Sequence, residues 1–416
     1  MNQYSFCYIK EKLVALQRFM QLFFLLLFLL PSIAFGKQPL QCGIDRLDAS
    51  QFRELAGLRV GLITNAAALT QRGEQNYKAM QRCGVNLRFL MAPEHGLAAN
   101  VEAGKKVGHS VSADSLPVYS LYGATRKPEQ RHLHDIDLLL FDLQDVGVRC
   151  YTYISTMKLA MEACAEAGIP FMVLDRPNPI APLQPQGFML QAGYESFVGL
   201  VSVPFVHGMS VGEIALLLQR AHYPNLDVRI ITMTGYQPHC FGDELEGFTF
   251  RSPSPNIRDV ATALLYPATV LLEATTVSEG RGTQAPFQQF GAPFIKSNEL
   301  LQALERYHLA GVKLRAVRFT PTASKWKGEE CKGIGITVTN RRSFSPFAMS
   351  VALLRELQRL YPAQLGLDIK RNATFFDRLA GTPRLRELIV QQASLQDILA
   401  ESEREVARFR AVRLYR

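Results

Sequence analysis

The sequence lacks the short motifs that mark the commonest cofactor sites. No G-x-G-x-x-G follows a predicted strand, and neither a Walker A motif nor H-E-x-x-H occurs, so nucleotide binding and zinc-protease chemistry lose their main support. The seven cysteines show no C-x-x-C and no Cys/His spacing typical of zinc. We therefore expect neither a metal nor an organic cofactor.

Strong charge and biased composition are also scarce. Charged residues make up 20% of the chain and hydrophobic residues 48%, without low-complexity tracts or long like-charge runs, which is typical of a globular protein. The net charge of +9 suits an anionic substrate. Because the basic residues are dispersed and accompany no recognition motif, we expect no nucleic-acid partner.

The one long apolar run lies near the N-terminus. Three basic residues precede the apolar segment 19–30, and small residues follow up to Gly36. This pattern predicts a signal peptide over residues 1–36, cleaved near Gly36, and hence an exported, periplasmic protein. The alternative is an uncleaved membrane anchor, because the segment is close to the ~17 residues that span a bilayer. After export, Cys42 and Cys83 are the nearest candidates for a disulfide.

The length of 416 residues exceeds one ordinary core, so we expect two domains, 37–258 and 259–416. In the first, predicted strands alternate with helices, which indicates right-handed crossovers and a mainly parallel α/β sheet. The strands are expected at 58–64, 87–91, 117–121, 136–142, 171–174 and 198–206, and the helices at 71–83, at 152–167 and up to 220. The second part is a smaller α+β domain, with strands at 312–319 and 334–338 and helices near 297–307 and from about 346, 382 and 394.

Four predicted strands are followed by polar clusters. In open α/β sheets the ligand crevice lies outside the carboxyl ends of the strands, so these side chains are candidates for the site. They are Glu94 and His95; Asp142, Gln144 and Asp145; Asp175, Arg176 and Asn178; and His207. The alternative for the central cluster is that Asp142 caps the next helix and that residues 145–147 form only a turn.

A serine motif offers a second hypothesis. Gly208-Met-Ser-Val-Gly212 fits G-x-S-x-G between a predicted strand and a helix, which is the context of a hydrolase nucleophile elbow. His222, His239 or His308 would supply the base. The alternative is that Ser210 and Glu213 form a capping box at the start of the helix.

Carboxylates favour a different chemistry. Glu94 follows Pro93 at a predicted strand end, where burial would raise its pKa and let it act as a general acid. Glycoside hydrolysis commonly uses two such carboxylates. The partner stays open: Glu162 lies on the helix 152–167, where it could instead pair with Lys158, and Asp142, Asp145 and Glu279 compete for the role.

Several longer motifs occur together along the chain. They are Ala92-Pro-Glu-His-Gly96, Phe141-Asp-Leu-Gln-Asp-Val-Gly147 with Arg149 and Tyr151-Thr-Tyr153, Leu174-Asp-Arg-Pro-Asn-Pro179, His207-Gly-Met209, Pro253-Ser-Pro-Asn256 and Ser278-Glu-Gly-Arg-Gly-Thr283. In this order they resemble the exo-β-N-acetylmuramidase family, long described as a domain of unknown function. The resemblance runs from about Cys42 to the C-terminus.

The resemblance implies a Rossmann-like domain without a nucleotide, and a smaller C-terminal domain that closes the cleft. It also implies release of N-acetylmuramic acid from the non-reducing ends of peptidoglycan fragments, so the expected partner is a muropeptide or a related glycan. Glu94 matches the family acid, and Glu162 is the transferred second carboxylate. The expected substrate-binding residues are His95, Asp142, Gln144, Asp145, Arg149, Tyr151, Asp175, Arg176, Asn178, His207, Asn256, Glu279 and Arg281. A non-catalytic peptidoglycan-binding protein is an alternative, because the chain departs from the family pattern at residues 97–100 and 180–187, where Gln186 replaces an acid.

Recognition of muramic acid requires a cation or a hydrogen-bond donor, because this sugar differs from glucosamine by a lactyl carboxylate. Arginine suits the task, since its planar fork binds a carboxylate at two points. Arg149, Arg176 and Arg281 are the candidates, although Arg149 could pair with Asp145 and Arg176 could lock its own loop. We favour Arg281, because glycines on both sides let the backbone approach a ligand closely.

Overall fold

The computed structural model describes residues 20, 38–112 and 114–415. The segment expected to be a signal peptide lies outside the described residues, apart from residue 20, so export stays a prediction. Pro39–Arg416 forms one compact unit. None of the helices in the described ranges is both long and apolar enough to cross a membrane.

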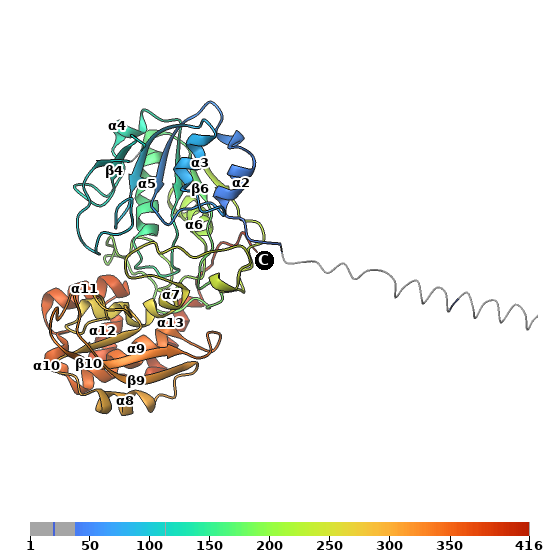
Figure 1. The fold of residues 1–416 in the computed structure, drawn as a ribbon. Coiled ribbons are helices and arrows are strands. Elements are labelled where there is room, and N and C mark those ends of the chain that lie inside the picture. The colour runs from blue at the N-terminus through green and yellow to red at the C-terminus, as the bar shows by residue number, and fades with distance from the viewer. Residues whose placement is uncertain (1–19, 21–37, 113, 416) are drawn as a thin grey trace, which may run out of the picture. The chain divides into compact units, whose positions relative to one another are not determined.

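A seven-stranded sheet forms the first part of this unit (Figure 1). Its order is β3-β4-β2-β1-β5-β6-β7, and all strands but β3 run parallel. The bounds are β1 Arg59–Thr64, β2 Asn86–Ala92, β3 Ser110–Val111, β4 Pro117–Ser120, β5 Leu138–Asp142, β6 Phe171–Leu174 and β7 Val228–Ile231. Counted along the chain, the six parallel strands lie in the order 3-2-1-4-5-6 of the Rossmann fold. The predicted α/β class is confirmed.

The central strand β5 is buried on both faces. Leu138 and Leu140 pack in one apolar cluster, whereas Leu139 and Phe141 pack in another, as the two-residue period of a strand requires. Helices therefore cover both faces. They are α2 Gly43–Ala49 and α3 Asn76–Arg82 on one side, and α4 Gln130–Leu133, α5 Tyr153–Ala167 and α6 Val211–His222 on the other.

The second part contains a smaller antiparallel sheet of order β8-β10-β9, which confirms the predicted α+β character. Its strands are β8 Gln289–Ala292, β9 Val312–Phe319 and β10 Cys331–Val338. Its helices are α8 Ser297–Glu305, α9 Pro346–Leu360, α10 Pro362–Leu365, α11 Lys370–Ala380, α12 Arg384–Val390 and α13 Leu395–Val406. Short 3-10 helices lie at Arg53–Leu55 (η1), Gly242–Glu244 (η2) and Val270–Ala274 (η3).

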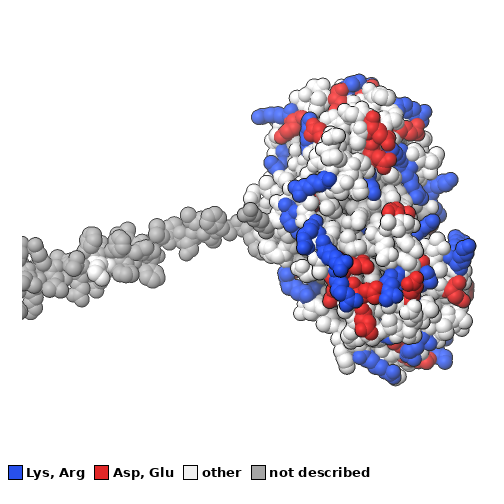
Figure 2. Space-filling view, turned by 180° about the vertical axis from the view of Figure 1, so that it is seen from behind, with Lys and Arg blue, Asp and Glu red and all other residues white. Residues whose placement is uncertain are grey.

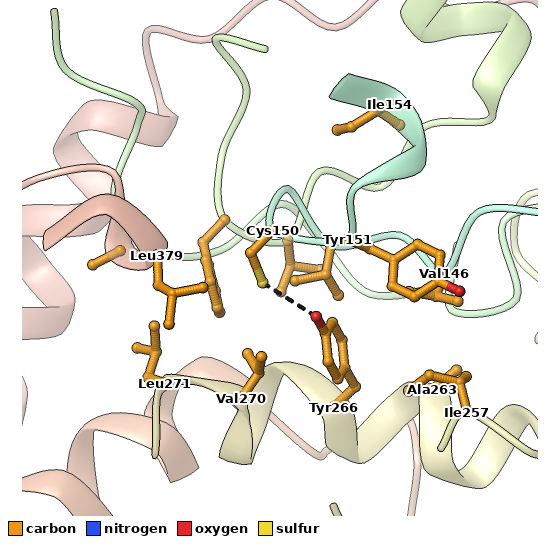
Figure 3. Close-up of a cluster of buried hydrophobic side chains, with 14 of the residues drawn as sticks. Val146, Cys150, Tyr151, Ile154, Ile257, Ala263, Tyr266, Val270, Leu271 and Leu379 are labelled. Atoms are coloured by element: carbon orange, nitrogen blue, oxygen red, sulfur yellow. Dashed lines mark hydrogen bonds between the residues drawn. The ribbon is translucent and has the colours of Figure 1, made fainter. Parts of the chain in front are cut away.

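Helix α7 (Val260–Thr269) joins the two parts. Its side chains pack beneath the loop that follows β5, in a cluster of buried apolar residues (Figure 3). Cys150 of that loop meets the Tyr266 hydroxyl at 3.6 Å. The loop that carries the predicted site is thus held by the second part of the chain.

Two elements differ from the sequence-based expectations. Residues 198–206 do not form a strand; isolated bridges join Val206 to Val148 and Gln186, and Gly199 to Ser196. Several carbonyls of this segment instead accept hydrogen bonds from Arg149 and from the Lys158 ammonium, and Pro204 has no N–H to donate. The sixth parallel strand is β7, which was missed although three of its four residues are Val or Ile.

The expected disulfide is absent. Cys42 and Cys83 are both free, as are the other four cysteines of the described ranges. Cys42 belongs to the apolar cluster on one face of the sheet, and Cys83, which follows α3, packs against the same cluster. The two thiols therefore share a cluster but are not bonded to each other.

Candidate active site

A cavity of about 1060 Å³ lies beside the carboxyl ends of β2, β4 and β5. One wall comes from the segments that follow these strands, with Glu94, Tyr122 and Thr152. The opposite wall comes from the second part of the chain, including Tyr266 of α7 and Arg378 of α11. The rule that ligands bind outside strand carboxyl ends therefore locates this cavity well.

Glu94 is the buried carboxylate of the first wall. Its side chain belongs to a residue only 6% exposed. Oε1 accepts a hydrogen bond from the Gly104 amide at 2.8 Å, and Oε2 accepts one from Thr152 Oγ1 at 2.7 Å. The next two residues, His95 and Gly96, have φ of 73° and 74°. The chain thus reverses directly after the glutamate, and a non-glycine residue takes a left-handed conformation of the kind that concentrates at functional sites.

His95 stabilises this turn. Its Nδ1 lies 2.7 Å from the carbonyl oxygen of Val101. Burial lowers the pKa of His95, although the Glu94 charge opposes this effect. The imidazole is therefore neutral around pH 7 and can donate through Nδ1 to that carbonyl.

Four charged side chains form a cluster in the second wall. Arg281 Nη2 lies 2.5 Å from Glu273 Oε1, and Arg281 Nε lies 3.1 Å from Glu279 Oε1. Lys325 Nζ lies 3.1 Å from the other oxygen of Glu279. Burial works to raise the pKa of Glu279, but the Lys325 and Arg281 charges outweigh it and hold the pKa below its ordinary value. In Glu273, burial dominates and raises the pKa.

Arg126 is a cation of different character. Its guanidinium carbon lies 4.3 Å from the ring centroid of Phe197 and 5.1 Å from that of Tyr122, so two aromatic rings hold it by cation–π contact. No carboxylate of the described residues is ion-paired with it. Tyr122 in turn borders Glu94: burial first, and the Glu94 charge second, raise the pKa of Tyr122 to about 12.

Tyr151 supplies a buried phenol. Its hydroxyl has no hydrogen-bond partner within the part of the chain that the structure describes, and burial raises its pKa. Tyr151 therefore stays protonated and can donate to a hydroxyl or amide of a bound sugar. Asn256 also lines the cavity.

The cavity thus contains six of the residues expected from the sequence: Glu94, His95, Tyr151, Asn256, Glu279 and Arg281. Nine others lie outside it: Asp142, Gln144, Asp145, Arg149, Glu162, Asp175, Arg176, Asn178 and His207. Most of these nine brace the strand ends from within. Among the residues that the structure describes, no group of three or more His, Cys, Asp or Glu side chains is placed to hold a metal ion.

The central cluster is an internal ion pair. Arg176 Nε donates to Asp142 Oδ1 at 2.5 Å, and Asn76 donates to the other oxygen at 2.8 Å. Asp142 and Arg176 are almost fully buried, so neither is available to a substrate. Because β5 and β6 are neighbours in the sheet, the residues that follow them meet each other instead.

The remaining residues of these strand ends are similarly occupied. Asp145 Oδ2 accepts from the Gly147 amide and lies 3.3 Å from His207 Nε2. The amides of Gln144 and Asn178 donate to carbonyl oxygens of the same loops. Because these side chains are already bound within the protein, the substrate-binding roles expected for them are wrong.

Ser210 is a helix cap and not an exposed nucleophile. Its hydroxyl accepts from the Glu213 amide and donates to Asp175 Oδ2 at 2.8 Å, while the Glu213 carboxylate accepts from the Ser210 amide. Ser210 is 2% exposed. The Tyr415 hydroxyl also donates to Asp175, and burial raises the pKa of Asp175 to about 6. The interpretation of Ser210 and Glu213 as a capping box is confirmed. The hypothesis that Ser210 is a hydrolase nucleophile is wrong.

Glu162 lies on the outer face of α5. Its carboxylate pairs with Lys127 at 2.7 Å, and its side chain is 39% exposed. The expected pairing with Lys158 is wrong, because that ammonium donates to the Leu200 carbonyl. Glu162 therefore does not reach the cavity, whereas Glu273 and Glu279 do.

Arg149 is fully buried without an acidic partner among the described residues. Its guanidinium donates to the carbonyl oxygens of Phe188, Val203 and Ala380. Ala380 ends α11, so Arg149 ties the second part of the chain to the loops of the first. The expected pair with Asp145 does not form.

The two departures from the family pattern also lie away from the cavity. Neither 97–100 nor 180–187 lines it. Gln186 Oε1 accepts from Ser345 and from the Phe347 amide, which is a structural contact. By contrast, Tyr122 and Arg126 line the cavity but were missed, although they follow a predicted strand in the same manner as Glu94.

Buried carboxylates, a phenol and guanidinium groups thus line one cavity. Family models described as "Exo-beta-N-acetylmuramidase NamZ" match residues 60–261 for the N-terminal domain and 264–415 for the C-terminal domain. The Bacillus subtilis protein "Peptidoglycan beta-N-acetylmuramidase NamZ" is 40% identical over 380 residues, which cover 91% of each chain.

Two solved structures from Bacteroides fragilis, both titled as DUF1343 family proteins, are also similar. One is 33% identical with a TM-score of 0.82 and covers 92% of this chain and 100% of its own. The other is 26% identical with a TM-score of 0.70 and covers 89% and 96%. The chain belongs to the NamZ exo-β-N-acetylmuramidase family.

Proposed function

We propose that this protein is an exo-acting glycoside hydrolase that releases N-acetylmuramic acid from the non-reducing ends of peptidoglycan fragments, with Glu94 as general acid. Family membership supports the activity. The observation that carries the assignment of Glu94 is the burial of its carboxyl group in the cavity wall. In this chemistry the acid protonates the leaving glycosidic oxygen.

For the second carboxylate we propose Glu279. Since Lys325 and Arg281 hold its pKa below the ordinary value, it is ionised at neutral pH. An ionised carboxylate can activate water or stabilise the positive charge that develops on the sugar ring. The neighbouring Glu273, whose pKa is raised, is less suited to this role.

Turnover of a chromogenic N-acetylmuramide tests the activity, and Ser210→Ala separates it from a serine hydrolase. We expect wild-type turnover and an unchanged kcat in Ser210→Ala, because this residue lies outside the cavity. The variant should lose about 1 kcal/mol of unfolding free energy with its cap. A Ser210→Ala enzyme that is inactive yet folded would support the elbow, and a wild type that binds without turnover would indicate a binding protein.

Arg126 is our candidate for recognition of the lactyl carboxylate. Arg281 is less suitable than the sequence suggested, because two carboxylates already balance its charge. Arg126→Ala should lower kcat/KM on the muramide by roughly 10- to 100-fold, the effect of about 1.5–3 kcal/mol from a charge-assisted hydrogen bond. The assay compares muramide substrates that carry a free or a methyl-esterified lactyl group.

The matched control is Arg258→Ala, which removes another cavity arginine whose guanidinium donates to carbonyls of Thr283 and Gln284. Any loss of kcat/KM in this control should be equal on the free acid and the ester, so the wild-type preference for the free acid should persist. Equal losses on both substrates in Arg126→Ala would remove Arg126 from carboxylate recognition.

A further inference from the structure

We propose that the leaving part of the glycan chain binds in a basic groove beside the cavity, along one face of α11. The groove has a volume of about 1150 Å³. It shares four lining residues with the cavity, namely Glu273, Lys325, Phe375 and Arg378. The two spaces therefore adjoin, and a chain whose end occupies the cavity can extend into the groove.

Helix α11 presents a regular array to this groove. Arg371, Phe375 and Arg378 are spaced i, i+4 and i+7, so they lie on one face of the helix. The residues that follow Phe375 and Arg378, Phe376 and Leu379, are buried. In Figure 1, α11 lies at the edge of the second part that is nearer the seven-stranded sheet. Because a helix rises about 1.5 Å per residue, Arg371 and Arg378 are about 10 Å apart along the helix axis.

The positive charge of the groove is not balanced locally. Lys370, Arg371 and Arg378 are exposed, and none is ion-paired with a described residue. The acid of the groove wall, Glu273, is already paired with Arg281. Elsewhere, basic and acidic side chains are interspersed on the face seen in Figure 2. An anionic ligand would therefore find unpaired cations along this groove.

The inference rests on the proposed function, which supplies the chemistry of the ligand. In peptidoglycan, muramic acid recurs at every second sugar, so a glycan freed of its peptides carries carboxylates at regular intervals. Two guanidinium forks two helical turns apart suit carboxylates that repeat along an extended chain. Phe375 between them offers an apolar face to a sugar ring.

The test compares kcat/KM for a peptide-free disaccharide and a peptide-free tetrasaccharide, each with N-acetylmuramic acid at its non-reducing end. We expect the wild type to prefer the tetrasaccharide and the preference to weaken at high salt. Lys370→Glu combined with Arg371→Glu should reduce the ratio of tetrasaccharide to disaccharide kcat/KM by roughly three- to tenfold. The control is Arg404→Glu, an exposed arginine of α13, which should leave the ratio unaltered.

The outcomes separate the two proposals. If the wild type does not hydrolyse the disaccharide, the proposed function fails. If it hydrolyses both substrates equally, or if the double variant keeps the wild-type ratio, only the groove is contradicted.

Discussion

Replacing Glu94 with glutamine is expected to lower kcat/KM by roughly 10²- to 10⁴-fold, the usual contribution of a positioned general acid. Glutamine keeps the shape of the side chain but has no acidic proton to transfer to the leaving oxygen. Its carbonyl oxygen can still accept from the Gly104 amide. Its amide can donate to Thr152 Oγ1, because a hydroxyl rotates to accept as readily as it donates. The fold should therefore survive the change.

The measurement is kcat/KM together with the thermal midpoint of unfolding. Glu102→Gln is the matched control, because Glu102 also lines the cavity but is exposed and paired with Lys105 at 2.7 Å. We expect the control to retain most activity. A Glu94→Gln enzyme with wild-type activity would exclude Glu94 as the acid, and a loss accompanied by unfolding would reduce its role to a structural one.

Glu279→Gln requires the same pair of measurements. It should lower kcat, but it also removes the partner of Lys325 and Arg281, and breaking a buried ion pair is costly. A loss of activity at an unchanged thermal midpoint would support Glu279 as the second carboxylate. A stable variant with full kcat would contradict that role.

The Rossmann-like class could be predicted from the sequence because apolar runs alternate with helical segments, and Glu94 could be found because it directly follows such a run. What the sequence could not reveal is which polar side chains face each other. Asp142 and Arg176 follow neighbouring strands, and their mutual pairing removes both from the cavity. Likewise, Glu273 is eight residues from Arg281 along the chain, and only the folded loop brings it to 2.5 Å.

The second wall of the cavity was largely beyond prediction for the same reason. Helix α11 begins after Ile369 without a side-chain cap, so the usual sequence signal of a helix start is missing. Its contribution depends on docking against η3 and on the bonds from Arg149. Tyr122 and Arg126, in contrast, follow β4 and could have been found by the rule that located Glu94.

Replacing Arg149 with methionine is expected to lower the free energy of unfolding by about 3 kcal/mol. Two effects oppose each other. Burial lowers the pKa of Arg149 to about 10. At about 1.4 kcal/mol per pKa unit, removing the buried charge would raise the free energy of unfolding by roughly 3 kcal/mol. However, the carbonyls of Phe188, Val203 and Ala380 lose their donor, and each unsatisfied group costs about 1–3 kcal/mol. The second effect is the larger, since three groups are involved.

Denaturant unfolding measures this difference. Arg59→Met is the control, because Arg59 forms an ion pair with Asp137 but its side chain is 42% exposed, and such surface pairs contribute only about 0–1 kcal/mol. Gly381, at φ 76°, leaves room for the Arg149 guanidinium beside α11, so the guanidinium also fixes where that helix ends. If Arg149→Met were as stable as the wild type, water or another donor would have to satisfy the three carbonyls. The link between α11 and the sheet would then depend on apolar packing alone.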